Sequence, residues 1–364
     1  MDEAFGTTGK TLRSDLVRAV VVGLGVAVAF TGAQAFPENP PCPTRELAPL
    51  GLAPVPNQCA TADCLVLFKG YKWWTSYAYN KVEFFTNYGL GTPFAPNHVF
   101  IDGSSQNMVL KADNDINLGG GNIWSGAEAV LMFDQNNNEA NLGYGNYLVT
   151  AKLTMPGSSS FDALDPNVAF GVFTYERLGP FPYEKKTGTP ENPQRELDLA
   201  EISRWGHAAG TTCTIRGRDG KFDTSRLCLG DAQFALQLVP QGGDPMVQRY
   251  CISGDVRVAP NCTVTTNPEI TLVMRWHGAN QQVTFEEYTG AYTFAQLGSQ
   301  HPAPHYTWET PTNSPNLNMY VPATGCQRFH INLWFGNYGT GQLLHPAPSS
   351  PQEVVIENFE FQPM

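Results

Sequence analysis

The segment RELDLAEISRWG, residues 195–206, carries three carboxylates in a pattern that a regular β-strand cannot place on one face. Side chains of a strand alternate between two faces, so Glu196 and Asp198 point one way and Glu201 the other. Burying an unpaired carboxylate costs roughly several kcal/mol. A β-bulge at Leu199–Ala200 removes the conflict, because two residues then share one ladder position and parity shifts by one. The segment therefore predicts a bulged strand with all three acids on one face.

Two glutamates with an aspartate between them suit retaining hydrolysis of a glycosidic bond. That reaction needs a carboxylate nucleophile and a carboxylic acid that donates a proton, about 5–5.5 Å apart. The side chains must lean together, because Glu196 and Glu201 lie four effective strand steps apart, about 13 Å. Asp198 can hydrogen-bond the nucleophile, and like charges at this spacing raise the pKa of one acid. The alternative is a solvated strand face whose counter-ions are Arg195 and Arg204.

Further strand patterns lie on both sides of this segment. The composition, with 35 Gly, 28 Pro, 21 Phe, 14 Tyr and 7 Trp, suits short strands joined by turns. No helical periodicity follows the N-terminal apolar segment. The fold class predicted is an all-β, antiparallel sandwich in one domain. Its strands are expected at 97–103, 107–112, 144–157, 167–176, 231–239, 269–278, 281–288, 329–336 and 353–361.

The acidic segment resembles the E-x-D-x-x-E signature of glycoside hydrolase family 16, in its bulged form. Three more segments resemble that family in the same order: GYGNYLVTAKL (143–153), FGVFTYE (170–176) and INLWFGN (331–337). The resemblance spans about residues 65–361 and implies a concanavalin A-like jelly-roll β-sandwich of two antiparallel sheets. It implies Glu196 as nucleophile, Asp198 as its assistant and Glu201 as general acid/base. The bulged form resembles that of laminarinases, agarases and carrageenases, and the laminarinase-like branch implies a β-1,3-containing glucan.

A sugar cleft also needs aromatic faces and side-chain amides. Trp205 follows the acids on the same strand, and Gln233 belongs to the strand expected next to it. Tyr175 lies within the FGVFTYE segment. Asn332 and Trp334 share one strand face, and the resemblance places both in the cleft. For each of these five residues the alternative is ordinary packing.

No cofactor is predicted. The sequence lacks C-x-x-C and H-E-x-x-H motifs, so zinc is not indicated. A structural calcium ion is left open at DNDIN (113–117) and FDQNNNE (133–139), although turns are the favoured interpretation of both. His207, His277 and His330 show no ligand spacing and are expected to make core or surface hydrogen bonds.

The chain is acidic, with a net charge of −11 over 364 residues, which argues against a nucleic-acid partner and favours an uncharged sugar. Three basic residues precede an apolar run of 12 residues at 19–30, and a small-x-small site follows. This predicts a signal peptide over 1–35, with an uncleaved anchor as the alternative. A Pro-rich spacer over 36–58 and a single domain over 59–364 follow.

Eight cysteines, all beyond residue 35, indicate disulfide bonds in an exported protein, with the pairing left open. They are Cys42, Cys59, Cys64, Cys213, Cys228, Cys251, Cys262 and Cys326.

The sequence therefore predicts a secreted, monomeric, retaining endo-β-glycanase whose partner is a polysaccharide substrate. It leaves open a non-catalytic, lectin-like jelly roll, a transglycosylase on the same scaffold, and a structural envelope protein.

Overall fold

A computed structural model gives the structure of the protein. The residues that it describes are 65–75, 94–117, 122–136, 138, 140, 142–154, 164–165, 167–176, 194–203, 215–216, 222–223, 232–239, 246–250, 269–278, 282–310, 321, 327–335 and 347–364. The signal peptide, the spacer, all eight cysteines and Trp205 lie outside these residues and stay predictions.

Strands dominate the described residues. They are β1 (Leu65–Phe68), β2 (Tyr71–Thr75), β3 (Val99–Ile101), β4 (Met108–Asn117), β5 (Asn122–Ser125), β6 (Ala127–Phe133), β7 (Gly145–Thr154), β8 (Val168–Glu176), β9 (Gln194–Ser203), β10 (Ile215–Arg216), β11 (Phe222–Asp223), β12 (Ala232–Val239), β13 (Met246–Tyr250), β14 (Glu269–Trp276), β15 (Val283–Thr289), β16 (Tyr306–Glu309), β17 (Gln327–Phe335) and β18 (Gln352–Pro363). The helical elements are η2 (Pro96–His98) and α2 (Phe294–Gln300).

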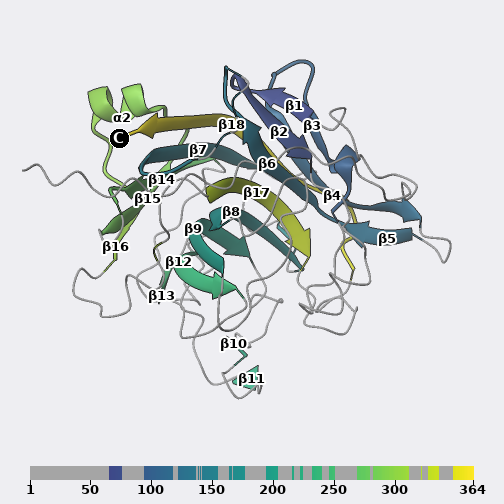
Figure 1. Ribbon diagram of the computed structural model, residues 1–364. Coiled ribbons are helices and arrows are strands. Elements are labelled where there is room, and N and C mark those ends of the chain that lie inside the picture. The colour runs from purple at the N-terminus through teal and green to yellow at the C-terminus, as the bar shows by residue number, and fades with distance from the viewer. Residues whose placement is uncertain are drawn as a thin grey trace, which may run out of the picture. The chain divides into compact units, whose positions relative to one another are not determined.

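Two large antiparallel sheets make up the fold (Figure 1). Sheet A has the strand order β1-β2-β6-β17-β8-β9-β12-β13. Sheet B has the order β16-β15-β14-β7-β18-β4-β3, and β5 pairs with β4 at its side. The predicted all-β, antiparallel sandwich is confirmed. Among the described residues, neither helical element has the length and apolar character of a membrane span.

The core lies between the sheets because each strand turns alternate apolar side chains inward. On β7, Tyr147 and Val149 belong to the main core cluster, whereas Leu148 faces the opposite side of sheet B. Tyr147 stacks on Phe329 of sheet A, with ring centroids 5.6 Å apart and planes 9° from parallel. Aromatic contacts of this kind join the two inner faces into one core.

Helix α2 was not expected from the sequence. Its seven residues are too few to show a helical period. Local chemistry starts it instead: the Thr293 side chain accepts from the Gln296 backbone N–H, and the Gln296 side chain accepts from the Thr293 backbone N–H. Leu297 then packs with Leu148 on the outer face of sheet B.

The two acid- and amide-rich segments differ in structure. DNDIN (113–117) is the end of strand β4, so the turn favoured there is wrong. In the other segment Asp134 accepts hydrogen bonds from the backbone N–H groups of Asn136 and Asn138, each 2.8 Å long, which confirms a turn. The Asp134 carboxylate is therefore used to close that turn.

Candidate functional site

Strand β9 carries the predicted bulge. Along β8, Val172 pairs with Ala200 and the next residue, Phe173, pairs with Asp198, so Leu199 has no partner. The ladder with β12 shifts at the same place, because Gln233 pairs with Glu201 and Ala235 with Asp198. One extra residue on β9 thus interrupts both ladders, and the prediction of a bulge at Leu199–Ala200 is confirmed.

The bulge lets every apolar residue of the segment face the core. Leu197, Leu199 and Ile202 are fully buried, and Ala200 is 1% exposed. Two consecutive residues, Leu199 and Ala200, both belong to the main core cluster, which a regular strand would not allow. The three acids are left together on the opposite side of the strand.

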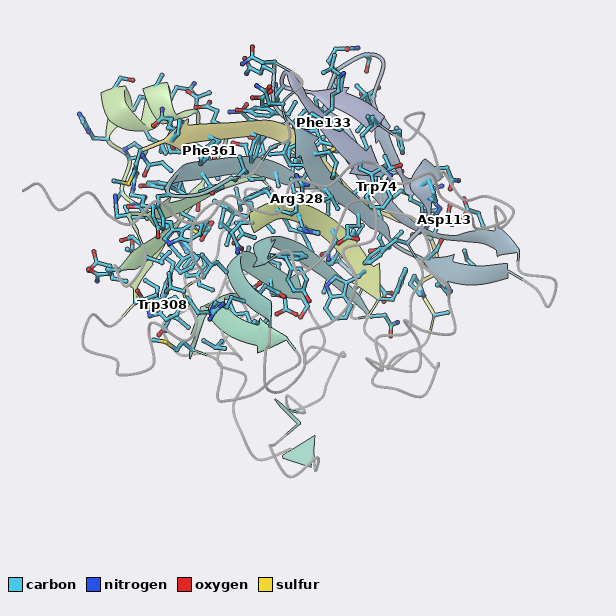
Figure 2. The ribbon with its side chains drawn as sticks, in the orientation of Figure 1. Trp74, Asp113, Phe133, Trp308, Arg328 and Phe361 are labelled. Atoms are coloured by element: carbon cyan, nitrogen blue, oxygen red, sulfur yellow. The ribbon has the colours of Figure 1, made fainter. Side chains whose placement is uncertain are left out.

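That side is the face of sheet A turned away from the core, which we call the acid face. Its side chains form three rows across strands β17, β8, β9 and β12, because the cross-strand pairs line up. The rows are Asn332–Gly171–Glu201–Gln233, His330–Phe173–Asp198–Ala235 and Arg328–Tyr175–Glu196–Gln237. Figure 2 shows Arg328 on β17, within this sheet. Each acid therefore has defined neighbours on both adjacent strands.

Two glutamines of β12 hold the three acids. The Gln237 side-chain amide donates to Glu196 Oε1 and to Asp198 Oδ2, each at 2.9 Å. The Gln233 amide donates to Glu201 Oε2. Ala235 lies between the glutamines and opposite Asp198, so its small side chain leaves room for Gln237 to reach two acids at once.

The carboxyl groups of Glu196 and Asp198 both have a raised pKa, and burial is the largest cause for each. Burial raises the pKa of the Asp198 carboxyl well above its usual range, and the charge of Glu196 and a hydrogen bond to it raise the pKa further. Burial also raises the pKa of Glu196, but the hydrogen bonds from Asp198 and Gln237 oppose this. These effects favour the proton on Asp198 and the charge on Glu196.

Gly171 separates Asn332 from Glu201 in its row. A Cβ atom at Gly171 would come within 2.4 Å of Asn332 Oδ1, so only glycine lets the asparagine amide lie over β8. Asn332 is 8% exposed, and among the described residues its Oδ1 has no hydrogen-bond partner. A buried acceptor of this kind is available to a ligand hydroxyl.

Of the site residues predicted from the sequence, some lie in the rows that contain the acids. Tyr175, Asn332 and Gln233 lie in rows with the acids. Trp334 is on the same side of β17 but pairs with Ala169, one row beyond Glu201. These positions establish proximity, and the roles in binding and catalysis remain predictions.

Three polar residues near the acids were not selected from the sequence. Gln237 has the same strand parity as Gln233, and this could have indicated it. His330 and Glu128 could not be found in this way, because their strands β17 and β6 are about 200 residues apart in sequence. His330 was expected to make only core or surface hydrogen bonds.

The described part of the chain contains no group of three or more His, Cys, Asp or Glu side chains arranged to hold a metal ion.

Comparisons with known proteins find similarity in structure only. No family model and no curated protein matches the chain. Among solved structures, a β-1,3-1,4-glucanase (lichenase) from a mouse hindgut metagenome is 12% identical, with a TM-score of 0.45 over 80% of this chain and 93% of that one. The catalytic domain of an endo-1,3-β-glucanase (laminarinase) from Thermotoga petrophila is 12% identical, with a TM-score of 0.45 over 82% and 92%.

A Mycobacterium tuberculosis protein, described as an immunostimulatory antigen and pseudo β-1,3-glucanase, is 14% identical, with a TM-score of 0.43 over 79% of this chain and 89% of that one. At these identities and TM-scores, nothing about reaction or substrate follows for this protein.

Proposed function

We propose that the protein is a secreted, retaining endo-β-glycanase that hydrolyses a neutral, β-1,3-containing glucan. The observation that carries the proposal is the one-residue register shift of β9, which gathers Glu196, Asp198 and Glu201 on the acid face. A strand that merely displayed surface charge would gain nothing from a bulge or from amide donors aimed at each acid. The assignment of nucleophile and acid/base follows the motif resemblance.

In this mechanism Glu196 attacks the anomeric carbon while Glu201 donates a proton to the departing glycosidic oxygen. The bond from sugar C1 to that oxygen breaks, and a covalent glycosyl–enzyme ester forms at Glu196. Glu201, now a carboxylate, then takes a proton from water. The water oxygen attacks C1 and releases Glu196 with net retention of configuration.

Asp198 and Gln237 prepare Glu196 for the attack. The proton on Asp198 and the amide of Gln237 both interact with Glu196, so its charge is stabilised despite burial. When charge leaves Glu196 during attack, these donors keep the carboxylate oriented without becoming charged themselves. The arrangement thus supplies an anionic nucleophile at a site where burial alone would favour its neutral form.

The charges of the three rows favour an uncharged glycan. Three acids occupy the rows, and the two basic residues are not offered to a ligand anion. Arg328 is fully buried and its Nη1 donates to the backbone oxygen of Ala140 at 3.2 Å. His330 Nδ1 contacts the Glu128 carboxylate at 3.0 Å. A sulfated or uronic-acid polymer would therefore find no cation offered for pairing in these three rows, and it would meet the Glu196 anion. The β-1,3 linkage rests on the resemblance of the bulged motif to laminarinases.

The first test is a reducing-end assay on laminarin, lichenan, agarose, carrageenan and xyloglucan. We expect the wild type to act fastest on laminarin or lichenan. We expect Glu196→Gln and Glu201→Gln each to lower kcat by about 10³-fold or more, because each removes a group that acts in the transition state. Glu353→Gln is the matched control, since Glu353 is a strand glutamate of sheet B and its loss should leave kcat unchanged.

The lectin-like alternative gives a different pattern. A wild type that binds one of these polysaccharides, releases no reducing ends and binds equally well with either glutamine variant would contradict the enzyme proposal. A transglycosylase would instead cleave the polymer and transfer the fragment to an added oligosaccharide, while losing activity in the same two variants.

A further inference from the structure

A histidine and a carboxylate form a further pair on the acid face, two and three strands away from the strand of Glu196. His330 Nδ1 and Glu128 Oε1 are 3.0 Å apart, which joins β17 to β6. Both side chains are largely buried, with 8% and 15% of their surfaces exposed. The contact is an ion pair when the imidazole is protonated.

The pair is held on the side of the acids by aromatic rings. The His330 ring stacks on Phe173, with centroids 4.9 Å apart and planes 16° from parallel. It meets Tyr175 edge-on at 5.9 Å. Phe173 is the cross-strand neighbour of Asp198, and Tyr175 is that of Glu196. With strands about 4.8 Å apart, His330 lies about 10 Å from β9, so its charge acts through low-dielectric aromatic rings.

We propose that Glu128 and His330 form a charge-compensated positioning pair that sets the ionisation of Glu196 across the sheet. The inference rests on the proposed function, since it deepens the role of the same nucleophile. His330 stabilises the Glu196 anion, and Glu128 limits that effect while fixing the imidazole. Neither residue touches the reacting atoms, so both act through Glu196.

The charges of His330 and Glu128 have opposite effects on the pKa of Glu196. Burial raises the pKa of Glu196 most strongly, and the hydrogen bonds from Asp198 and Gln237 lower it. Beyond these, the positive charge of His330 lowers the pKa and the negative charge of Glu128 raises it. The other titratable or charged groups of the rows are Tyr175 on β8, Arg328 on β17, and Asp198 and Glu201 on β9; β12 contributes only glutamines and alanine.

The test compares His330→Gln, Glu128→Gln and the double variant by two readouts. The first is the Glu196 carboxyl resonance, followed against pH in protein labelled with carbon-13 at glutamate carboxyls and assigned through Glu196→Gln. The second is the acid limb of kcat/KM on the polysaccharide that the wild type hydrolyses fastest.

We expect the Glu196 titration to move to higher pH in His330→Gln, to lower pH in Glu128→Gln and to return near wild type in the double variant. At acid pH we compare kcat/KM divided by its plateau value for each variant. This ratio should fall by about three-fold in His330→Gln and rise by about three-fold in Glu128→Gln. Glu286→Gln, which removes the partner of Arg275 on sheet B, should leave both readouts unchanged.

Single variants that leave the titration of Glu196 in place, or that move it in the same direction, would overturn the inference. Lower plateaus with an unmoved acid limb would show a merely structural role and would overturn it as well. The resonance is independent of turnover, so a wild type without hydrolytic activity but with opposite titration shifts would contradict the proposed function alone.

Discussion

At Asp198, burial and the charge of Glu196 both raise the pKa of the carboxyl, which favours the protonated form that the proposed mechanism gives to this residue. The residue is 3% exposed and receives one hydrogen bond from Gln237. Sequence parity predicted that Asp198 shares a face with Glu196, because that inference needs only local alternation. Gln237 was not selected, although it shares strand parity with Gln233; its contact with two acids depends on the register of β12 against β9.

Replacing Asp198 with asparagine should stabilise the protein in a pH-dependent way. Because the folded-state pKa of Asp198 is raised above its unfolded value, the folded chain binds more protons, and stability is lost as pH rises between the two values. Asp198→Asn mimics the protonated form and removes this loss. We expect a melting temperature higher by about a few degrees at neutral pH, and equal to wild type below about pH 3.9, the unfolded value.

Thermal unfolding across this pH range measures the effect. Asp113→Asn is the control, since Asp113 forms an ion pair with Lys111 and the pKa of its carboxyl is lowered rather than raised. A melting temperature of Asp198→Asn below wild type at neutral pH would contradict a protonated Asp198.

At the scale of elements, the bulge is the feature that joins fold and site. The bulge could be predicted because a regular strand cannot place the three acids on one face and all of its apolar residues in the core. Helix α2 could not, because a seven-residue helix rests on a capping box rather than on periodicity. The end of β4 was expected to be a turn because Asp and Asn residues are depleted in strands. An ion pair with Lys111 accommodates Asp113 there, and a hydrogen bond with His98 accommodates Asp115.

Deleting Ala200 should be tolerated, because it turns the bulged strand into a regular one. Glu196, Asp198 and Glu201 then follow strict alternation on one face, and Ile202 still faces the core. We expect a loss of about 1–2 kcal/mol in the free energy of unfolding, from one missing core methyl group and local repacking.

Deleting Ala235 from the regular neighbouring strand is the matched comparison. It reverses parity between Phe234 and Leu236, both fully buried, so one of them must leave the core. That deletion should cost at least about 3 kcal/mol. Denaturant unfolding measures the free energy of unfolding of both variants. An equal loss in the two would show that Ala200 is not the extra residue of a bulge.

At the scale of the whole molecule, the sequence indicated two antiparallel sheets but not the order of strands within them. β17 lies beside β8, although about 150 residues separate them in sequence, and β9 is placed between β8 and β12. Such pairings depend on the packing of the complete core, which local patterns do not encode. The rows that join His330 to Phe173, and Asn332 to Gly171, exist only because of this order.

The central claim is that Glu196 attacks sugar and forms a covalent intermediate. The most direct measurement uses a 2-deoxy-2-fluoro-β-glycosyl fluoride made from the disaccharide unit of the polysaccharide hydrolysed fastest. Fluorine at C2 slows hydrolysis of the intermediate, so the glycosyl–enzyme accumulates and peptide mass spectrometry locates it. The structure predicts one glycosyl group on the peptide that contains Glu196, and none in Glu196→Gln. Absence of any adduct on the wild type, or an adduct on another residue, would contradict the claim.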